Sequence, residues 1–254
     1  MATLSYKPRV VITALLAATV SLAAVAQTPA PNTTEWESEA FSLRLFYPSD
    51  LVKADPAKVM HDGHLTLLGI SGAPDPKLAE MTHCLRPALL LELPQAGSAQ
   101  TTKTQPTADN GTQVPITPAI TATILLAELD IDCLNSDHVN TSTTLLPDLA
   151  ELVTKVPGMK SIVQPAWYNV GWQKIHMAAA QGQPLPSDSA NSQSTNLSQL
   201  YTMGLSTNWN SHLLVWYFSS NNIDTLNRIT KTTVRFGRAQ AAPLYPNPMG
   251  TAAP

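Results

Sequence analysis

Short apolar segments with a strand pattern dominate this chain, and this pattern favours an antiparallel sheet with few helices. The segment from Phe41 to Tyr47 begins with alternating apolar and polar residues, the period of a half-buried strand. Pro48 ends it because proline cannot donate a hydrogen bond to a sheet. Further strands are predicted over 65–70, 83–93, 119–134, 167–180, 200–205 and 212–219.

Helical spacing is clearest over 141–156, and Pro157 ends this helix. A second helix is predicted over 224–234, with Asp224 as its cap. A short helical turn is expected near 75–81. The apolar residues of the first helix recur every three or four positions and form one buried stripe: Leu146, Leu149, Leu152, Val153 and Val156.

Polar segments predict the domain organisation. Residues 95–118 and 182–198 show no apolar period and are expected to be long mobile loops. They interrupt a single α+β domain over 36–236. A flexible leader over 27–35 precedes this domain, and a loose Pro- and Ala-rich tail over 237–254 follows it.

The first 26 residues have the order of a secretory signal peptide. Lys7 and Arg9 form a basic start, 10–25 is an uncharged apolar run, and Ala24-Val25-Ala26 is a cleavage site of small residues. The mature chain is therefore expected to begin near Gln27 and to be exported to the periplasm or the extracellular space. No later run approaches the roughly 18 apolar residues that a membrane span requires, so no membrane span is predicted.

The charge balance bears on the class of partner. The chain contains 15 Lys and Arg against 18 Asp and Glu, and the expected signal peptide removes Lys7 and Arg9 but no acid. The mature chain then has 13 basic and 18 acidic residues, a net charge of −5. Nucleic-acid binding depends on a basic patch, so this balance argues against a nucleic-acid partner.

Two cysteines, Cys84 and Cys133, are the only ones in the chain. An even count in an exported protein favours a disulfide, and both residues lie at the ends of predicted strands. Two separate buried thiols are the alternative.

Three segments carry a resemblance to a known family. They are Phe41-Ser-Leu-Arg-Leu-Phe-Tyr-Pro-Ser-Asp50, Gly171-Trp-Gln-Lys-Ile-His176, and Leu213-Leu-Val-Trp-Tyr-Phe-Ser-Ser220 followed by a helix that ends at Phe236. Together they resemble the PsbP/Mog1-type α/β/α sandwich, which is also seen in small bacterial exported proteins. The resemblance implies an antiparallel sheet flanked by helices, and a binding or assembly role without catalysis. The insertion at 95–118 departs from a minimal version of that fold.

Common catalytic motifs are absent from the sequence. Gly69-Ile-Ser-Gly-Ala73 lacks the second glycine of a nucleophile elbow at the required place, and there is no H-E-x-x-H, P-loop, G-x-G-x-x-G or paired C-x-x-C. No catalytic residue and no cofactor are therefore predicted. Two alternatives stay open: a secreted hydrolase whose site is assembled from distant residues such as His61, His64 or His176, and a small-ligand carrier with a pocket between helix and sheet.

The segment His61-Asp62-Gly63-His64 is the best candidate for a metal site. Two imidazoles and a carboxylate within four residues have the composition of a partial ligand set. Asp-Gly is also a common tight-turn sequence, and a solvated turn is the competing interpretation. Two further histidines, His176 and His212, lie on predicted strands and have no acidic partner that the sequence reveals.

Trp209 is the candidate binding residue. Residues 207–211 are predicted to form a hairpin turn, which would leave the Trp209 ring exposed between Asn208 and Asn210. The other aromatic residues of the last third, Trp172 included, are expected mainly in the core, with a binding face as the alternative. These features favour an exported non-catalytic binding or accessory protein, whose partner is a protein or an envelope component.

Overall fold

The computed structural model describes residues 32–61, 64–65, 76–95, 120–134, 142–183, 199–247 and 249. The expected signal peptide and nearly all of the two expected loops lie outside these residues.

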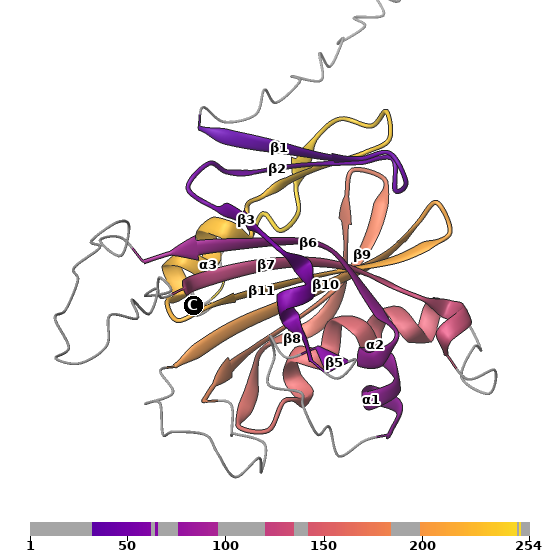
Figure 1. Ribbon diagram of the computed structural model, residues 1–254, viewed down its shortest axis with the longest axis vertical. Helices are drawn as coiled ribbons and strands as arrows, with labels where there is room; N and C mark the ends of the chain where they lie inside the picture. Colours follow the sequence, from indigo (N-terminus) through magenta and orange to yellow (C-terminus); the bar gives the residue numbers. More distant parts are fainter. Residues whose placement is uncertain are drawn as a thin grey trace, which may run out of the picture.

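A seven-stranded antiparallel sheet forms the centre of the fold (Figure 1). Its strands lie in the order β3-β6-β7-β11-β10-β9-β8, so β8 is an edge strand. The bounds are β3 (Val52–Ala54), β6 (Leu85–Pro94), β7 (Ile120–Leu129), β8 (Met159–Val170), β9 (Gln173–Gly182), β10 (Leu200–Trp209) and β11 (His212–Ser220).

A second, smaller sheet lies over one face of the large sheet (Figure 1). It joins both ends of the described chain in the order β1-β2-β12-β13. Its strands are β1 (Thr33–Ser38), β2 (Leu43–Pro48), β12 (Thr233–Phe236) and β13 (Ala242–Pro243). The remaining elements are the ribbon of β4 (Met60–His61) and β5 (His64–Leu65), the 3₁₀ turns η1 (Pro56–Val59) and η2 (Ile131–Cys133), and the helices α1 (Pro76–His83), α2 (Ser142–Lys155) and α3 (Ile223–Ile229).

Alternation along the central strands supplies two hydrophobic cores. Trp216 and Phe218 of β11 point toward the smaller sheet and α3, where they share a core with Leu45 of β2. Val215 and Tyr217 of the same strand point the other way and share a core with α2. Because successive strand residues face opposite sides, a strand that is apolar throughout is buried on both faces, as β11 is.

The predicted helix over 141–156 is confirmed as α2, and its apolar stripe is buried against the large sheet. The helix comes very close to β10 at Gly204, where a Cβ atom would lie 2.2 Å from the carbonyl oxygen of Ala150. Tyr217 also donates a hydrogen bond of 2.7 Å from its hydroxyl to the Leu149 carbonyl. Glycine at position 204 is therefore required for this close contact.

The strand predicted over 167–180 is wrong, because the chain reverses direction in its middle. A two-residue loop, Gly171 and Trp172, joins β8 to β9, which pair antiparallel with Val170 opposite Gln173. Gly171 adopts φ +61°, a left-handed conformation in which glycine is favoured. Glycine at the first loop position is typical of type II′ hairpin turns, so this signal was present in the sequence.

Both ends of the described chain are more ordered than predicted. The final helix α3 ends at Ile229, and its cap is Asn222, whose side chain accepts hydrogen bonds from the backbone amides of Asp224 and Thr225. The chain then continues as β12. Within the expected loose tail, Leu244 and Tyr245 are buried, and within the expected leader β1 already begins at Thr33.

The structure is mostly antiparallel sheet with few helices, as the sequence pattern predicts. Helices α1 and α2 cover one face of the large sheet, whereas the smaller sheet and α3 cover the other. The PsbP/Mog1-type assignment stays a prediction.

Candidate functional site

Two hairpin turns lie at the same end of the large sheet, which we call the hairpin end (Figure 1). One is the β8–β9 loop with Trp172, and the other is the β10–β11 loop of Asn210 and Ser211. Asn210 and Ser211 both have positive φ, +49° and +68°, as a type I′ hairpin requires. The predicted hairpin is thus present, but its strands extend to Trp209 and its loop is shorter.

The expectation that the Trp209 ring is exposed is wrong. Because β10 extends through residue 209, the ring lies beneath the smaller sheet and is only 8% exposed. Its indole N–H donates a hydrogen bond of 2.7 Å to the Phe41 carbonyl, and its ring centroid lies 5.2 Å from that of Phe236. Trp209 is therefore a core residue that joins the two sheets.

The exposed aromatic residue of the hairpin end is Trp172. Its side chain is 66% exposed, and its ring centroid lies 5.1 Å from that of Trp209. One side of the Trp172 ring is thus supported by a buried ring, while most of it faces solvent. The sequence analysis missed this residue because it placed Trp172 inside a continuous strand.

Polar residues surround the two turns. Asn208, Asn210 and Ser211 are exposed. Next to Trp172, the buried Gln173 side chain donates hydrogen bonds from Nε2 to Thr207 Oγ1 at 2.6 Å and to the Asn208 carbonyl at 2.9 Å. These bonds tie β9 to β10 directly behind the turns and fix the backbone that carries Trp172.

A cavity of about 370 Å³ lies at the same end of the sheet, beside the β10–β11 turn. Within it, His212 Nδ1 lies 2.5 Å from Glu128 Oε1, and the Phe41 ring meets the His212 ring edge-on at a centroid distance of 5.1 Å. The lining residues are Arg86, Glu128, Leu129, Asp130, Ile131, Asp132, Ser211 and His212.

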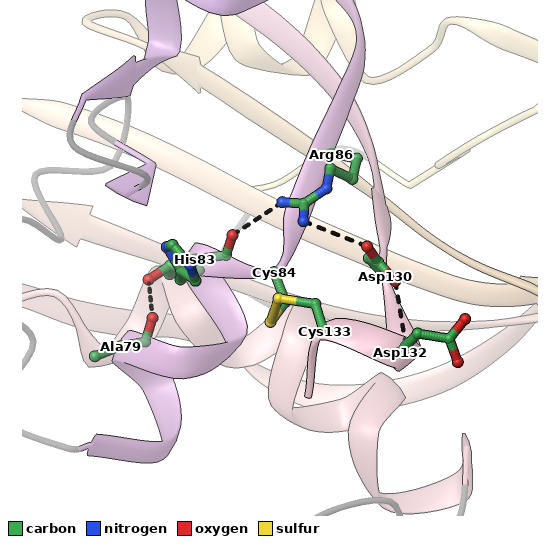
Figure 2. Close-up of a disulfide and its surroundings, with 8 residues drawn as sticks. Ala79, His83, Cys84, Arg86, Asp130, Asp132 and Cys133 are labelled. Atoms are coloured by element: carbon green, nitrogen blue, oxygen red, sulfur yellow. Dashed lines mark hydrogen bonds and ion pairs between the residues drawn. A yellow bond between two sulfur atoms is a disulfide. The ribbon is translucent and has the colours of Figure 1, made fainter. Parts of the chain in front are cut away.

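The predicted disulfide is confirmed, and its two cysteines are close in sequence to Arg86 and Asp132, which line this cavity. Cys84 and Cys133 are joined with their Cα atoms 5.5 Å apart, so the start of β6 is linked to η2 (Figure 2). Beside it, the Arg86 guanidinium contacts the Asp130 carboxylate at 3.3 Å. The Asp130 side chain also accepts a hydrogen bond from the Asp132 amide. The bridge thus holds the segment that supplies part of the cavity wall.

His212 has the acidic partner that its sequence context did not reveal. Glu128 lies diagonally across the β7–β11 pair, in which Leu213 is opposite Leu129. The side chains of His212 and Glu128 are 31% and 30% exposed, so both reach solvent in the cavity. A carboxylate on one imidazole nitrogen orients the ring and leaves the other nitrogen for proton transfer or hydrogen bonding.

The predicted metal site at His61 and His64 stays a prediction. The two residues are opposite each other in the β4–β5 register, but their side chains, Asp62 and Gly63 lie outside what the structure describes. Across the described ranges, no group of three or more His, Cys, Asp and Glu residues is placed to hold a metal ion.

His176 is buried on the opposite face of the sheet, under α2. Its Nε2 atom lies 3.9 Å from Glu151 Oε1 of α2, and the Trp167 ring packs edge-on at 4.8 Å. Its Nδ1 atom is buried without a hydrogen-bond partner among the described residues. Burial disfavours the charged imidazolium and lowers the pKa of His176 below its usual 6.5.

This burial predicts a loss of stability in acid. The unfolded chain binds the His176 proton more tightly than the folded protein, so the contribution of this residue is fully present above about pH 6.5 and is lost as the pH falls below that value. We expect the melting temperature to fall between pH 7 and pH 5, and to fall less in a His176→Gln variant. An unchanged pH slope in His176→Gln would show that His176 is not held neutral.

Among the described residues, none of the helices combines the length and the apolar composition of a membrane-spanning segment. The chain was also compared with models of known protein families and with curated proteins, and none of them matches it.

Proposed function

We propose that the protein is an exported, non-catalytic binding or accessory protein of the cell envelope or extracellular space, and that it binds its ligand at the hairpin end. One observation carries this proposal: Trp172 is 66% exposed although it stands in a hairpin turn and packs against a buried ring. A tryptophan buries about 150–250 Å² when covered, and aromatic side chains dominate the energetics of many binding sites.

The support beneath Trp172 favours a binding role because it reduces the entropic cost of binding. When binding immobilises a mobile side chain, the lost side-chain entropy costs about 0.5–1.5 kcal/mol of binding free energy. Trp172 packs on Trp209, which is itself held by Phe41 and Phe236. The cavity beside the neighbouring turn offers polar groups within the same region.

Export is supported by the predicted signal peptide and by the disulfide. Disulfides persist in oxidising compartments and are rare in the cytosol, and the Cys84–Cys133 bridge is present.

Binding to cell-envelope fractions tests the proposal. We expect saturable binding of the mature protein, and we expect Trp172→Ala to weaken it at least about tenfold, equivalent to about 1.4 kcal/mol. Trp167→Ala is the matched control, because Trp167 is also exposed but lies against His176 on the opposite face of the sheet. Equal binding by Trp172→Ala and wild type, or no binding to any fraction, would contradict the proposal.

A second candidate function is hydrolysis at the His212–Glu128 pair, which the sequence analysis did not name among its hydrolase candidates. Glu128 would hold the imidazole while the other ring nitrogen accepts a proton from water. We would measure turnover of p-nitrophenyl esters and p-nitrophenyl glycosides. Activity that is lost in His212→Gln would support this candidate, whereas no turnover by the wild type would remove it for these substrates.

A further inference from the structure

We infer that the ligand of the hairpin end is an uncharged glycan, with one sugar ring stacked on Trp172. This inference rests on the proposed function and specifies its ligand. Three features of the described residues carry it: an isolated exposed indole, its uncharged polar neighbours, and carboxylates in the adjoining cavity.

The first feature is the isolation of Trp172. The described chain has four exposed large hydrophobic residues, Val52, Ile120, Trp167 and Trp172, and Trp172 is the most exposed of them. Val52 and Ile120 lie on strand β3 and at the start of β7, and Trp167 lies on the opposite sheet face against His176. A protein interface usually surrounds its aromatic anchor with further apolar contacts, and none of the other three supplies them.

A single flat ring suits a sugar. The face of a pyranose presents C–H groups with partial positive charge, and the face of an indole is the negative pole of its quadrupole. The two faces therefore attract each other, and the sugar hydroxyls stay at the edge, where they form hydrogen bonds. The Trp172 ring is held ready for such stacking because its other contact is the buried Trp209 ring at 5.1 Å.

The neighbouring polar groups match sugar hydroxyls. Asn210 and Ser211 are exposed in the adjacent turn and are uncharged, and each side chain both donates and accepts hydrogen bonds. Ser211 also lines the cavity, so the turn connects the Trp172 region to the cavity. Beneath this turn, the Trp209 indole donates a hydrogen bond to the Phe41 carbonyl, and the Phe41 ring contacts the His212 ring.

The cavity favours an uncharged glycan over an acidic one. Its three carboxylates, Glu128, Asp130 and Asp132, outnumber its two basic side chains. Arg86 already contacts Asp130, and His212 contacts Glu128. Carboxylates accept strong, short hydrogen bonds from hydroxyl groups, whereas they repel the carboxylates or phosphates of an acidic polymer. A glycan of several units, with one ring on Trp172 and another at the cavity, uses both regions.

The test has two arms. In the first, the mature protein is titrated with cellohexaose, chitohexaose and maltohexaose, and binding is followed by calorimetry and tryptophan fluorescence. We expect at least one hexasaccharide to bind, with affinity lost at least tenfold in Trp172→Ala, less in Trp172→Phe, and not in Trp167→Ala. Retained affinity in Trp172→Ala would overturn the stacking assignment.

In the second arm, envelope fractions are treated with protease, with periodate, which cleaves the vicinal diols of sugars, or with chitinase, because the internal units of a 1,4-linked N-acetylglucosamine chain have no vicinal diol. Binding that survives protease and disappears after periodate or chitinase supports the glycan. Binding that disappears after protease and survives periodate identifies a protein ligand, which overturns this inference and leaves the proposed function standing. Absence of binding to the untreated fraction contradicts both the glycan inference and the proposed function. Failure of the glycan inference alone is therefore distinguishable from failure of the proposed function.

Discussion

Trp209→Ala is expected to lower the free energy of unfolding by about 3–5 kcal/mol, the usual cost of truncating a buried tryptophan to alanine. The indole is 8% exposed and packs against Phe236 and Trp172. Its removal leaves a cavity between the two sheets and deprives the Phe41 carbonyl of its 2.7 Å hydrogen bond. Urea denaturation of the wild type and the variant measures the difference directly.

Trp209→Phe separates the two parts of this effect. Phenylalanine keeps much of the apolar contact but has no N–H donor. The main loss is then the hydrogen bond to the Phe41 carbonyl, and an unpaired buried carbonyl lowers the free energy of unfolding by about 1–3 kcal/mol. The phenylalanine variant should therefore lie between the wild type and Trp209→Ala. A change below about 1 kcal/mol in Trp209→Ala would mean that the ring does not join the sheets as described.

Removal of the disulfide should have an effect of similar size. The bridge joins cysteines 49 residues apart, and the chain-entropy model gives about 4 kcal/mol for a loop of that length. We expect the Cys84→Ala, Cys133→Ala double variant to unfold at a clearly lower urea concentration. Alanine is the better replacement for Cys84, because that site is buried and a serine hydroxyl would add a desolvation cost.

A reductant provides the matched comparison. Dithiothreitol should destabilise the wild type toward the level of the double variant and should leave the double variant unchanged. If the double variant is as stable as the oxidised wild type, the bridge does not stabilise the protein by restricting the unfolded chain.

Local sequence patterns account for the elements whose burial follows from their own spacing. The apolar stripe of α2 and the alternating residues of β2 were recognisable because side-chain period reports which face is buried, whereas β6, β7 and β11 were recognisable as short apolar runs. The start of β10 was also predicted. The even cysteine count, together with the expected export, predicted the bridge. The hairpin between β10 and β11 was also expected, although not the length of its strands.

The smaller sheet was not predicted, because it depends on pairing between segments at opposite ends of the domain. β2 pairs with β12, and Leu45 is opposite Val234 nearly 190 positions later. Neither strand has a local signal for that partner. The same long-range contact explains why the predicted tail is partly buried, since Leu244 packs into the core that this sheet closes.

The candidate site likewise combines features that follow from local sequence with features that depend on tertiary contacts. The sequence by itself determined that a hairpin with exposed Asn208 and Asn210 would form, since turn chemistry is local. Only the tertiary structure decided which tryptophan of the hairpin end is exposed: the smaller sheet covers Trp209, and the glycine turn at Gly171 leaves Trp172 in solvent. It also decided that Glu128 meets His212, because cross-strand neighbours are set by sheet register, a property of paired strands that neither strand carries alone.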